Sequence, residues 1–378
     1  MKTICYIGYP SNTLDHKWMN YFAEKSDEYK VIAICSSDNT EWPMLSDKIK
    51  VYPIFPNYFP IKNLRLKRSK LKQARTIMDQ HGVDVIHVLY AMPNAIWGNE
   101  LRKGEKLIIS TRGSDVMVQL DALKESNGLI DKINKSVLSY YYLKAFKKAD
   151  AISCTSGGQI KRLQQTIKRD DLQLIRSGID TNAWQEMIDK LSIEKNEGEY
   201  VIFSPRISSK FYHTDRIVEA FEMMRKEFPD QAFRLALVNY KNAQFDVELK
   251  EYFAEEGLND VIDFLPRQDV MGMAKWYKMA DVVVSVPKND GTPNSVMESQ
   301  LTLKPAIVGP IYYDPDLFDG DKVWITKSFS AEDIFEKMKE IYLMDTSSIQ
   351  TKLESIKTNT KNIIDISKQH ELIEKLYN

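Results

Sequence analysis

The chain has few cysteines and no long apolar run. These two absences argue against a disulfide-rich protein, a zinc protein and a membrane-spanning protein. The three cysteines among its 378 residues, Cys5, Cys35 and Cys154, stand far apart within apolar runs. This spacing fits neither a disulfide framework nor a zinc site, so we expect buried thiols in a reducing compartment. No apolar run approaches the roughly 20 residues of a membrane span, and the first residues have no signal-peptide profile. We therefore expect a cytoplasmic protein.

Charge of either sign is not in excess, since the net charge is −1. The chain therefore has no bulk attraction to nucleic acid, and it contains no recognised nucleic-acid-binding motif. Hydrophobic residues make up 43% and charged residues 28% of the sequence, as in globular proteins. The length is sufficient for two domains of ordinary size, each with its own core.

Short apolar runs alternate with longer amphipathic segments, a pattern that predicts parallel sheets with helices on both faces. The polar stretch 184–198 divides the runs into two series and is expected to connect two domains. We therefore predict an α/β protein with two doubly wound, Rossmann-like domains, residues 1–185 and 199–355, which face each other across a cleft. The predicted strands are 3–9, 30–35, 83–89, 106–111, 149–155 and 172–176, then 200–204, 233–238, 261–264, 281–286, 306–308 and 323–326.

The most informative stretch follows the predicted strand 281–286, where a glycine and a proline break the strand and a short helix follows. A strand, a tight loop and a helix start present backbone N–H groups with partial positive charge, which suits a phosphate or diphosphate. Asp290 ends the strand and Glu298 lies in the first helical turn, so both carboxylates are placed to accept hydrogen bonds from hydroxyls of one ligand. Alternatively, Ser295 and Glu298 form a capping box and bind no ligand.

Two cations and a carboxylate follow other predicted strands. Arg206 and Lys210 lie in the loop after strand 200–204, where they could clamp a diphosphate, the arginine through a bidentate fork and the lysine as a mobile charge. Asp115 follows strand 106–111 in a Gly-Ser-Asp turn, which puts a carboxylate where an acceptor hydroxyl would bind. Both motifs also fit a simpler interpretation, as solvated loop cations and a helix-capping aspartate.

Other polar residues are weaker candidates. Ser11 and His16 stand in the loop and helix start after the first strand, on the expected acceptor side, although an isolated histidine is more often structural. His87 lies inside a predicted strand and is expected to be buried and hydrogen-bonded. Asp314 and Asp316, one residue apart, resemble a metal-binding pair, but the surrounding glycine and proline favour a solvated turn. We therefore predict no required metal.

A basic run with no acidic residue follows the aromatic segment 55–61. A basic helix led by aromatic residues fits the surface of an anionic membrane, where each cation contributes on the order of 1 kcal/mol. The alternative is a solvated helix face, and the sequence favours neither. The cations are Lys62, Arg65, Lys67, Arg68, Lys70, Lys72 and Arg75.

The segment Asp290-Gly-Thr-Pro-Asn-Ser-Val-Met-Glu298 resembles the donor-site signature of retaining glycosyltransferases of family 4, and the other motifs occur in that family's order. Asp290 replaces the family's usual first glutamate, and Lys304 stands where a glycine normally precedes the proline. The resemblance implies the GT-B fold, with an acceptor-side first domain and a donor-binding second domain. It also implies that the helix 360–378 packs back on the first domain.

The resemblance further implies roles for individual residues. Binding of the nucleotide sugar falls to Arg206, Lys210, Asp290, Gly291, Thr292, Pro293, Asn294, Ser295 and Glu298. Catalysis falls to Asp115, Arg206, Lys210 and Asp290, and the acceptor side to Ser11, His16 and Asp115. The nucleotide sugar is a substrate, and no cofactor is implied.

Taken together, these features predict a glycosyltransferase (EC 2.4, hexosyltransferase type) that moves a sugar from a nucleotide-diphosphate sugar to a glycan or lipid-linked glycan, with retention. Bacterial relatives commonly build surface polysaccharides and glycoconjugates. We therefore expect a peripheral position on the inner face of the plasma membrane, with contact through the stretch from Phe55 to Arg75. Two alternatives are a nucleotide-sugar epimerase of related two-domain fold and a catalytically silent partner subunit.

Overall fold

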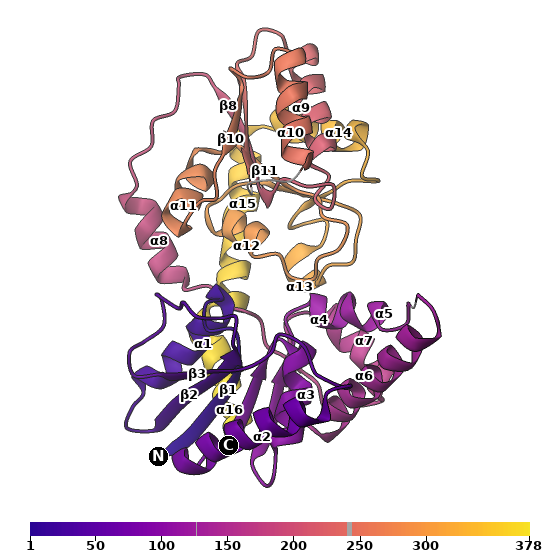
Figure 1. Cartoon of the computed structure of the whole chain (residues 1–378). Helices are drawn as coiled ribbons and strands as arrows, with labels where there is room; N and C mark the ends of the chain where they lie inside the picture. Colours follow the sequence, from indigo (N-terminus) through magenta and orange to yellow (C-terminus); the bar gives the residue numbers. More distant parts are fainter. Residues whose placement is uncertain (126, 240–243) are drawn as a thin grey trace. The chain divides into compact units, whose positions relative to one another are not determined.

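The computed structural model describes residues 1–125, 127–239 and 244–378, and the chain divides into two compact units (Figure 1). One unit consists of Met1–Ser177 together with Ser367–Asn378, and the other of Gly178–Ile366. Each unit contains one parallel sheet with its own apolar core. The predicted fold class, two parallel Rossmann-like α/β sheets, is confirmed.

The first unit contains a seven-stranded parallel sheet. Its strands are β1 (Lys2–Gly8), β2 (Tyr29–Ser36), β3 (Lys50–Phe55), β4 (Val85–Leu89), β5 (Lys106–Ser110), β6 (Ala151–Cys154) and β7 (Gln173–Leu174). They are arranged in the order β3-β2-β1-β4-β5-β6-β7. The central strands are almost wholly apolar because both faces of the sheet are covered. On β1, Cys5 and Ile7 pack into one core cluster, whereas Ile4 and Tyr6 pack into the other.

The second unit contains a six-stranded parallel sheet. Its strands are β8 (Tyr200–Ile207), β9 (Phe233–Val238), β10 (Ile262–Leu265), β11 (Val282–Ser285), β12 (Ala306–Val308) and β13 (Trp324–Ile325). They are arranged in the order β10-β9-β8-β11-β12-β13. Successive residues again serve opposite faces, since Ile202 and Phe203 of β8 belong to different core clusters.

Helices connect the strands and cover the sheets. Those of the first unit are α1 (Thr13–Glu24), α2 (Leu64–His81), α3 (Ala91–Leu101), α4 (Ser114–Met117), α5 (Gln119–Ala122), α6 (Leu129–Lys148), α7 (Gly157–Ile167) and, at the C-terminus, α16 (Ile366–Tyr377). Those of the second unit are α8 (Thr181–Lys190), α9 (Thr214–Glu227), α10 (Gln244–Glu255), α11 (Val270–Met279), α12 (Asn294–Leu301), α13 (Pro315–Phe318), α14 (Ala331–Tyr342) and α15 (Thr346–Ile364).

The sequence prediction missed β3. Pro53 has no backbone N–H, which argues against a central strand, but β3 lies at the edge of the sheet and pairs only with β2. Phe55 at its end stacks on Trp97 with ring centroids 4.4 Å apart, and Phe59 packs edge-on against the same indole at 4.8 Å. Both phenylalanines are core residues, so Tyr58 is the exposed aromatic of this segment. The expected membrane contact is corrected accordingly, because Phe55 and Phe59 do not face solvent.

A row of buried hydrogen bonds fixes α16 to the first sheet. Tyr377 Oη lies 2.6 Å from Tyr6 Oη and 2.7 Å from His87 Nδ1. On the other side of the imidazole, His87 Nε2 lies 2.7 Å from Ser110 Oγ, which lies 2.6 Å from Ser153 Oγ. All five side chains are buried, so their polar atoms depend on these partners. His87 therefore has the structural role that its position in a strand predicts.

The burial of His87 should make folding sensitive to acid. Burial, together with the positive charge of Arg112, lowers the pKa of His87 to about 3, whereas the unfolded chain titrates near the ordinary value of about 6.5. As the pH falls through this window the unfolded state takes up a proton and the folded state does not. The free energy of unfolding should therefore decrease toward acid, by up to about 1.4 kcal/mol per pH unit from this group.

Denaturant unfolding of wild type and His87→Gln at several pH values measures this contribution. The variant loses hydrogen bonds and is expected to be less stable near neutral pH, but its stability should fall less steeply between about pH 6.5 and pH 3. The gap between the two proteins should therefore narrow toward acid. Parallel stability curves would contradict the assignment of a neutral, buried imidazole.

Candidate active site

The second unit builds a polar cluster where β11 ends and α12 begins. The N-cap of α12 is Pro293, its first residue is Asn294, and no side chain caps it. Ser295 lies inside the helix, so the capping-box alternative for Ser295 and Glu298 is excluded. The first N–H groups of a helix have no acceptor within the helix, and without a capping side chain they are available to an anion.

Arg206, near the end of β8, lies next to this helix start. Its Nη1 is 3.4 Å from Ser295 Oγ, and its Nη2 is 2.9 Å from Tyr212 Oη. The guanidinium group also stacks over the Tyr212 ring, 4.6 Å from the ring centroid. Arg206 Nη2 is 3.2 Å from Asp290 Oδ2. The structure thus brings together three residues that the sequence assigns to the donor: Arg206, Asp290 and Ser295.

The carboxylate of Asp290 is only partly satisfied. Its Oδ1 accepts a hydrogen bond from the Gly291 N–H at 2.8 Å. Its Oδ2 contacts Arg206 as an ion pair but accepts no hydrogen bond of good geometry from the described residues. Burial raises the pKa of Asp290, while the Arg206 guanidinium and the Gly291 N–H act in the opposite direction. A half-buried carboxylate with an open acceptor position is a common feature of functional sites.

Tyr277 of α11 supports the first turn of α12. Its hydroxyl donates a hydrogen bond to the Ser295 carbonyl oxygen at 2.9 Å. Burial and the nearby carboxylate of Glu298 raise the pKa of Tyr277 well above its ordinary value. Glu298 itself is half-buried and is the fifth residue of α12, so it lies just beyond the first helical turn in which the sequence predicts it. The sequence analysis did not single out Tyr277, because a tyrosine in an apolar helix has the pattern of a core residue.

The loop after β12 adds two residues that the sequence did not assign to the site. Asp314 was expected in a solvated turn, but it is buried, and its Oδ2 lies 3.4 Å from Thr292 Oγ1. Tyr313 is also buried, and its hydroxyl has no hydrogen-bond partner among the described residues. Burial and the charge of Asp290 raise the pKa of Tyr313. Asp316 is exposed, so the two carboxylates of the predicted pair lie in different environments.

Lys210 lies apart from these contacts. Its Nζ pairs with Asp215 at 2.8 Å and lies 4.9 Å from the centroid of the Phe245 ring, and its side chain is exposed. The described structure gives it no contact with Arg206 or Asp290. Its role in diphosphate binding stays a prediction, and it requires the lysine to leave Asp215.

In the first unit, Asp115 binds the backbone. Its Oδ2 accepts a hydrogen bond from the Ala91 N–H at 2.8 Å, and its Oδ1 accepts from the N–H groups of Arg112 and Gly113 at 3.0 and 2.9 Å. The side chain is fully buried. Asp115 therefore fastens the turn after β5 to the start of α3. Its predicted role as receiver of an acceptor hydroxyl stays a prediction that would require this network to open.

The same turn carries a buried ion pair that the sequence analysis missed. Nε and Nη2 of Arg112 lie 3.2 and 3.1 Å from Asp15 Oδ1, and the guanidinium group covers the Trp18 ring at 4.0 Å. His16, the next residue on α1, is buried, and burial lowers its pKa. Its Nδ1 has no hydrogen-bond partner among the described residues. Ser11, by contrast, is exposed in the loop before α1.

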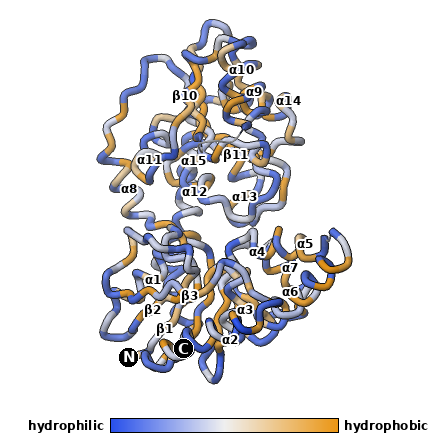
Figure 2. Tube along the Cα trace, viewed as in Figure 1, coloured by the Kyte–Doolittle hydropathy of each residue, from blue (hydrophilic) through white to orange (hydrophobic). Residues whose placement is uncertain are grey.

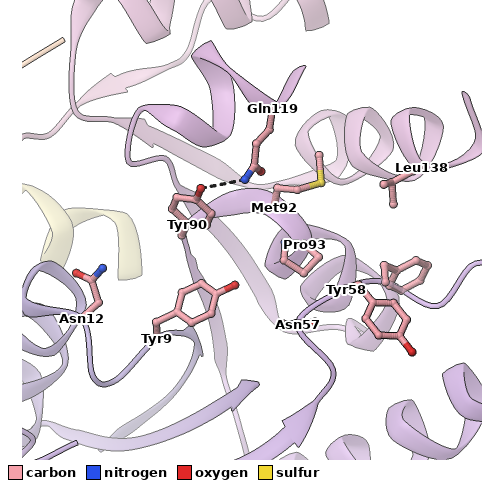
Figure 3. A pocket seen from close by; sticks show the side chains of 10 residues that line it. Tyr9, Asn12, Asn57, Tyr58, Tyr90, Met92, Pro93, Gln119 and Leu138 are labelled. Atoms are coloured by element: carbon pink, nitrogen blue, oxygen red, sulfur yellow. Dashed lines mark hydrogen bonds between the residues drawn. The ribbon is translucent and has the colours of Figure 1, made fainter. Parts of the chain in front are cut away.

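A pocket of about 560 Å³ opens in the first unit, beside the loops that follow β1 and β4 (Figure 3). Tyr9 and Tyr90 meet edge to face with ring centroids 5.9 Å apart, and Gln119 Nε2 donates a hydrogen bond to Tyr90 Oη at 2.9 Å. Gln119 Oε1 is buried and has no partner among the described residues. Aromatic rings with a few directed polar groups are typical of a ligand pocket. Its lining includes Tyr9, Asn12, Tyr58, Tyr90, Gln119 and Leu138.

The described residues contain no cluster of metal-ligating side chains. Across residues 1–125, 127–239 and 244–378, no three His, Cys, Asp or Glu side chains lie close enough to hold a metal ion. The requirement for a metal, or its absence, stays a matter for prediction and test.

The architecture and the site define a class of protein. Two parallel Rossmann-like sheets, of seven and six strands, are shared with solved glycosyltransferases of the GT-B fold. One is a glycosyltransferase from Rickettsia africae, with a TM-score of 0.75, 15% identity, and coverage of 100% of this chain and 97% of that one. Another is HepE of Anabaena in complex with UDP, with a TM-score of 0.73, 13% identity and 99% coverage of both chains. A third is WaaG, a glycosyltransferase involved in lipopolysaccharide biosynthesis, with a TM-score of 0.71, 12% identity and 100% coverage of both chains.

Family models make the assignment more specific. Residues 3–156 match the model described as glycosyl transferase 4-like, and residues 185–362 match glycosyl transferases group 1. The chain belongs to this group 1, family-4-like family of glycosyltransferases. The predicted family and enzyme class are therefore confirmed. A comparison with curated proteins found no match.

The contact between Tyr277 and Ser295 predicts a measurable effect on nucleotide binding. Tyr277→Phe removes the hydroxyl that holds the first turn of α12, so affinity for a nucleoside diphosphate should fall several-fold, corresponding to about 1 kcal/mol. The matched control is Tyr252→Phe, which removes a tyrosine hydroxyl that donates to Glu222 elsewhere in the second unit. Calorimetric titration with nucleoside diphosphates compares the two variants. Equal affinities in both variants would show that Tyr277 supports stability alone.

Proposed function

We propose that this enzyme transfers a sugar, with retention at the anomeric carbon, from a nucleoside-diphosphate sugar to a glycan or lipid-linked glycan. We place the reaction in bacterial surface polysaccharide or glycoconjugate synthesis. The observation that carries the donor part is the cluster of Arg206, Asp290 and Ser295 at the start of α12. It combines a cation, an uncapped helix N-terminus and a partly satisfied carboxylate, which together suit a diphosphate joined to a sugar.

The chemical step depends on stabilising the departing nucleoside diphosphate. Tyr212 and Asp290 hold Arg206 in place, so its charge needs little reorganisation when negative charge develops on the diphosphate. The N–H groups at the start of α12 add a fixed positive potential. Lys210 would supply a second cation on leaving Asp215.

The carboxylates of this cluster are proposed to bind hydroxyl groups. Oδ2 of Asp290 has an open acceptor position, which suits a hydroxyl of the donor sugar, and Glu298, the fifth residue of α12, would take the ribose. The donor phosphate is proposed to receive the proton of the acceptor hydroxyl, so no side-chain base is needed. This fits Asp115, whose oxygens are occupied by backbone N–H groups. The loop that completes the proposed donor site consists of Gly291, Thr292, Pro293 and Asn294.

We propose UDP-glucose as the first donor to test. The support comes from HepE of Anabaena, which shares the fold and has been solved with UDP and with UDP-glucose. A thermal-shift comparison of UDP, GDP and ADP with their sugars at equal concentration would rank the bases, since among ligands that bind only the folded state the one with the lower Kd raises the melting temperature more.

The acceptor is proposed to enter the pocket of the first unit. The faces of Tyr9 and Tyr90 offer apolar surface to a sugar ring, while the unpaired Oε1 of Gln119 can accept a hydrogen bond from a hydroxyl. Ser11 and His16, on the loop and helix that follow β1, stay assigned to the acceptor side.

The enzyme is proposed to work at the surface of the membrane. None of the helices in the described residues is long and apolar enough to cross a bilayer. Some cations of the basic run already form ion pairs within the protein. Lys67 pairs with Glu100 at 2.7 Å, and Arg75 pairs with both Asp79 and Glu105. Others are exposed and form no ion pair with a described residue, and these are available to anionic headgroups. They are Lys62, Arg65, Arg68 and Lys72.

Removing a charged group from the donor cluster should disable transfer and leave the fold intact. Arg206→Ala and Glu298→Gln should each lower kcat/KM by about 30-fold to 1,000-fold, which corresponds to about 2–4 kcal/mol of transition-state stabilisation. The control is Arg216→Ala, an exposed arginine of the same unit that pairs with Glu219. Turnover is measured with the nucleotide sugar that binds best, beside a melting curve for each variant. Near-normal turnover in Glu298→Gln would show that Glu298 does not bind the donor and only contributes to the surroundings of Tyr277.

Changing the tyrosine pocket should affect the acceptor and spare the donor. Tyr90→Ala removes a ring that a sugar would contact, so KM for the acceptor should rise about tenfold, equivalent to about 1.4 kcal/mol. Tyr90→Phe is the matched control because it keeps the ring and loses only the hydroxyl. The donor KM should stay unchanged in both variants. A rise in donor KM with an unchanged acceptor KM would place the acceptor elsewhere.

A further inference from the structure

Helix α6 has apolar side chains on two opposite faces. One face belongs to the core of the first unit, where Tyr142, Ala145 and Phe146 are fully buried. The other face points to solvent and carries residues spaced by three and four positions, which puts them in one row along the helix. We call this row the α6 stripe. It consists of Ile130 (70% exposed), Ile133 (55%), Val137 (39%) and Tyr140 (63%), with Leu129 (74%) at its start.

The α6 stripe differs from ordinary surface residues in its density. Single exposed apolar residues are common on proteins and need no explanation, whereas a contiguous apolar surface marks an interaction site. Among the elements in the described residues, no other helix or strand carries more than two large exposed apolar side chains. Figure 2 shows hydrophobic colour along α6 where the stripe lies.

The charges around the stripe are almost all positive. Helix α6 contains five lysines and a single aspartate, Asp131. Asp131 is already engaged, because Lys135 pairs with it at 3.2 Å. Lys144 lies 5.9 Å from the centroid of the Tyr140 ring, so a cation stands beside the stripe itself. An apolar row bordered by lysines is typical of a helix that lies at an anionic membrane surface.

The segment before α2 and the first turn of α2 contact this helix. Tyr141 of α6 packs against Phe59, with ring centroids 5.4 Å apart, and Lys67 of α2 lies 4.6 Å from the centroid of the Tyr141 ring. Tyr58 and Leu138 line the same pocket (Figure 3). The segment before α2 and the middle of α6 are therefore neighbours within the first unit. The exposed cations of the basic run and the lysines of α6 thus lie on the same unit.

We propose that the α6 stripe docks the enzyme on an anionic lipid bilayer, with the apolar side chains in the boundary between headgroups and acyl chains. The lysines of α6 and the exposed cations of the basic run would contact the headgroups. This inference rests on the proposed function, because docking on a bilayer would bring the enzyme to a lipid-linked acceptor. It places the tyrosine pocket, which shares Leu138 with α6, beside the lipid surface.

A label on the stripe tests insertion directly. Ile133→Cys provides one exposed thiol, because Cys5, Cys35 and Cys154 are buried, and it can carry an environment-sensitive fluorophore. Addition of vesicles of phosphatidylcholine and phosphatidylglycerol should increase the emission and shift it to the blue. Leu343→Cys, an exposed position of the second unit, is the control and should not respond. No response at position 133, or equal responses at both positions, overturns the proposal.

Vesicle sedimentation tests the energetic contribution of the stripe. Ile130→Ser combined with Ile133→Ser should lower partitioning into these vesicles about tenfold or more, while Leu343→Ser should bind like wild type. Arg65→Gln combined with Arg68→Gln should weaken binding at low salt. All variants should keep the wild-type melting temperature, because these side chains are exposed. Wild-type partitioning by the double isoleucine variant, or no binding by wild type, overturns the proposal.

Two further measurements separate this inference from its alternatives. Transfer to a water-soluble glycan should be unchanged in Ile130→Ser with Ile133→Ser, and vesicle binding is measured without any transfer, so failure of the proposed function leaves this test intact. A second copy of the chain is the other possible occupant of the stripe. Sedimentation in the absence of lipid that finds a dimer in wild type and a monomer in the double variant overturns membrane docking.

Discussion

Parallel pairing of the strands is the constraint on which both candidate sites depend. In a parallel sheet all strands run in one direction, so the carboxyl ends of all strands lie at one edge. In the second unit β8, β11 and β12 are neighbours, and the cluster is built from what lies at or beyond their ends: Arg206, Asp290 and Asp314. The first unit repeats the rule, since Tyr9, Tyr90 and Asp115 follow the neighbouring strands β1, β4 and β5. Residues far apart in the sequence are thus brought together by strand order.

The carboxylates at these edges, two of them buried and Asp290 half-buried, differ in their hydrogen-bond partners. Asp115 has both oxygens bonded to backbone N–H groups, and Asp15 is paired with a buried arginine, so each is satisfied within its own unit. A carboxylate whose oxygens are all hydrogen-bonded or paired holds a loop in place, and breaking those bonds to contact a ligand would cost free energy. Asp290 keeps Oδ2 without a hydrogen bond, although Arg206 neutralises its charge. That difference is the physical basis for assigning ligand contact to Asp290 and support to Asp115.

The sequence predicts much of this fold because apolar β-branched runs between polar helices leave few alternatives. The predicted strands 233–238 and 306–308 match β9 and β12 at both ends. The sequence analysis missed the edge strand β3 because Pro53 interrupts its strand pattern. In the site, local motifs single out Arg206, Asp290 and Ser295, and the neighbouring strands β8 and β11 bring them together. No such motif marks Arg112 and Asp15, so their pair could not be predicted.

The aspartate at position 290, where the family usually has a glutamate, is accommodated by contacts close to the backbone. A side chain shorter by one methylene keeps its carboxylate close to the backbone, where the Gly291 N–H holds one oxygen and Arg206 lies beside the other. Tyr313 supplies a second polar group nearby, and its hydroxyl, like Asp290 Oδ2, has no hydrogen bond within the described residues. Asp290 Oδ2 is paired with Arg206 and still has room for a hydrogen-bond donor, so a ligand can add to the contacts at this strand edge. We therefore propose that a polyhydroxylated ligand such as a sugar binds at this edge, where its hydroxyl groups would donate to the carboxylate and accept from the phenol.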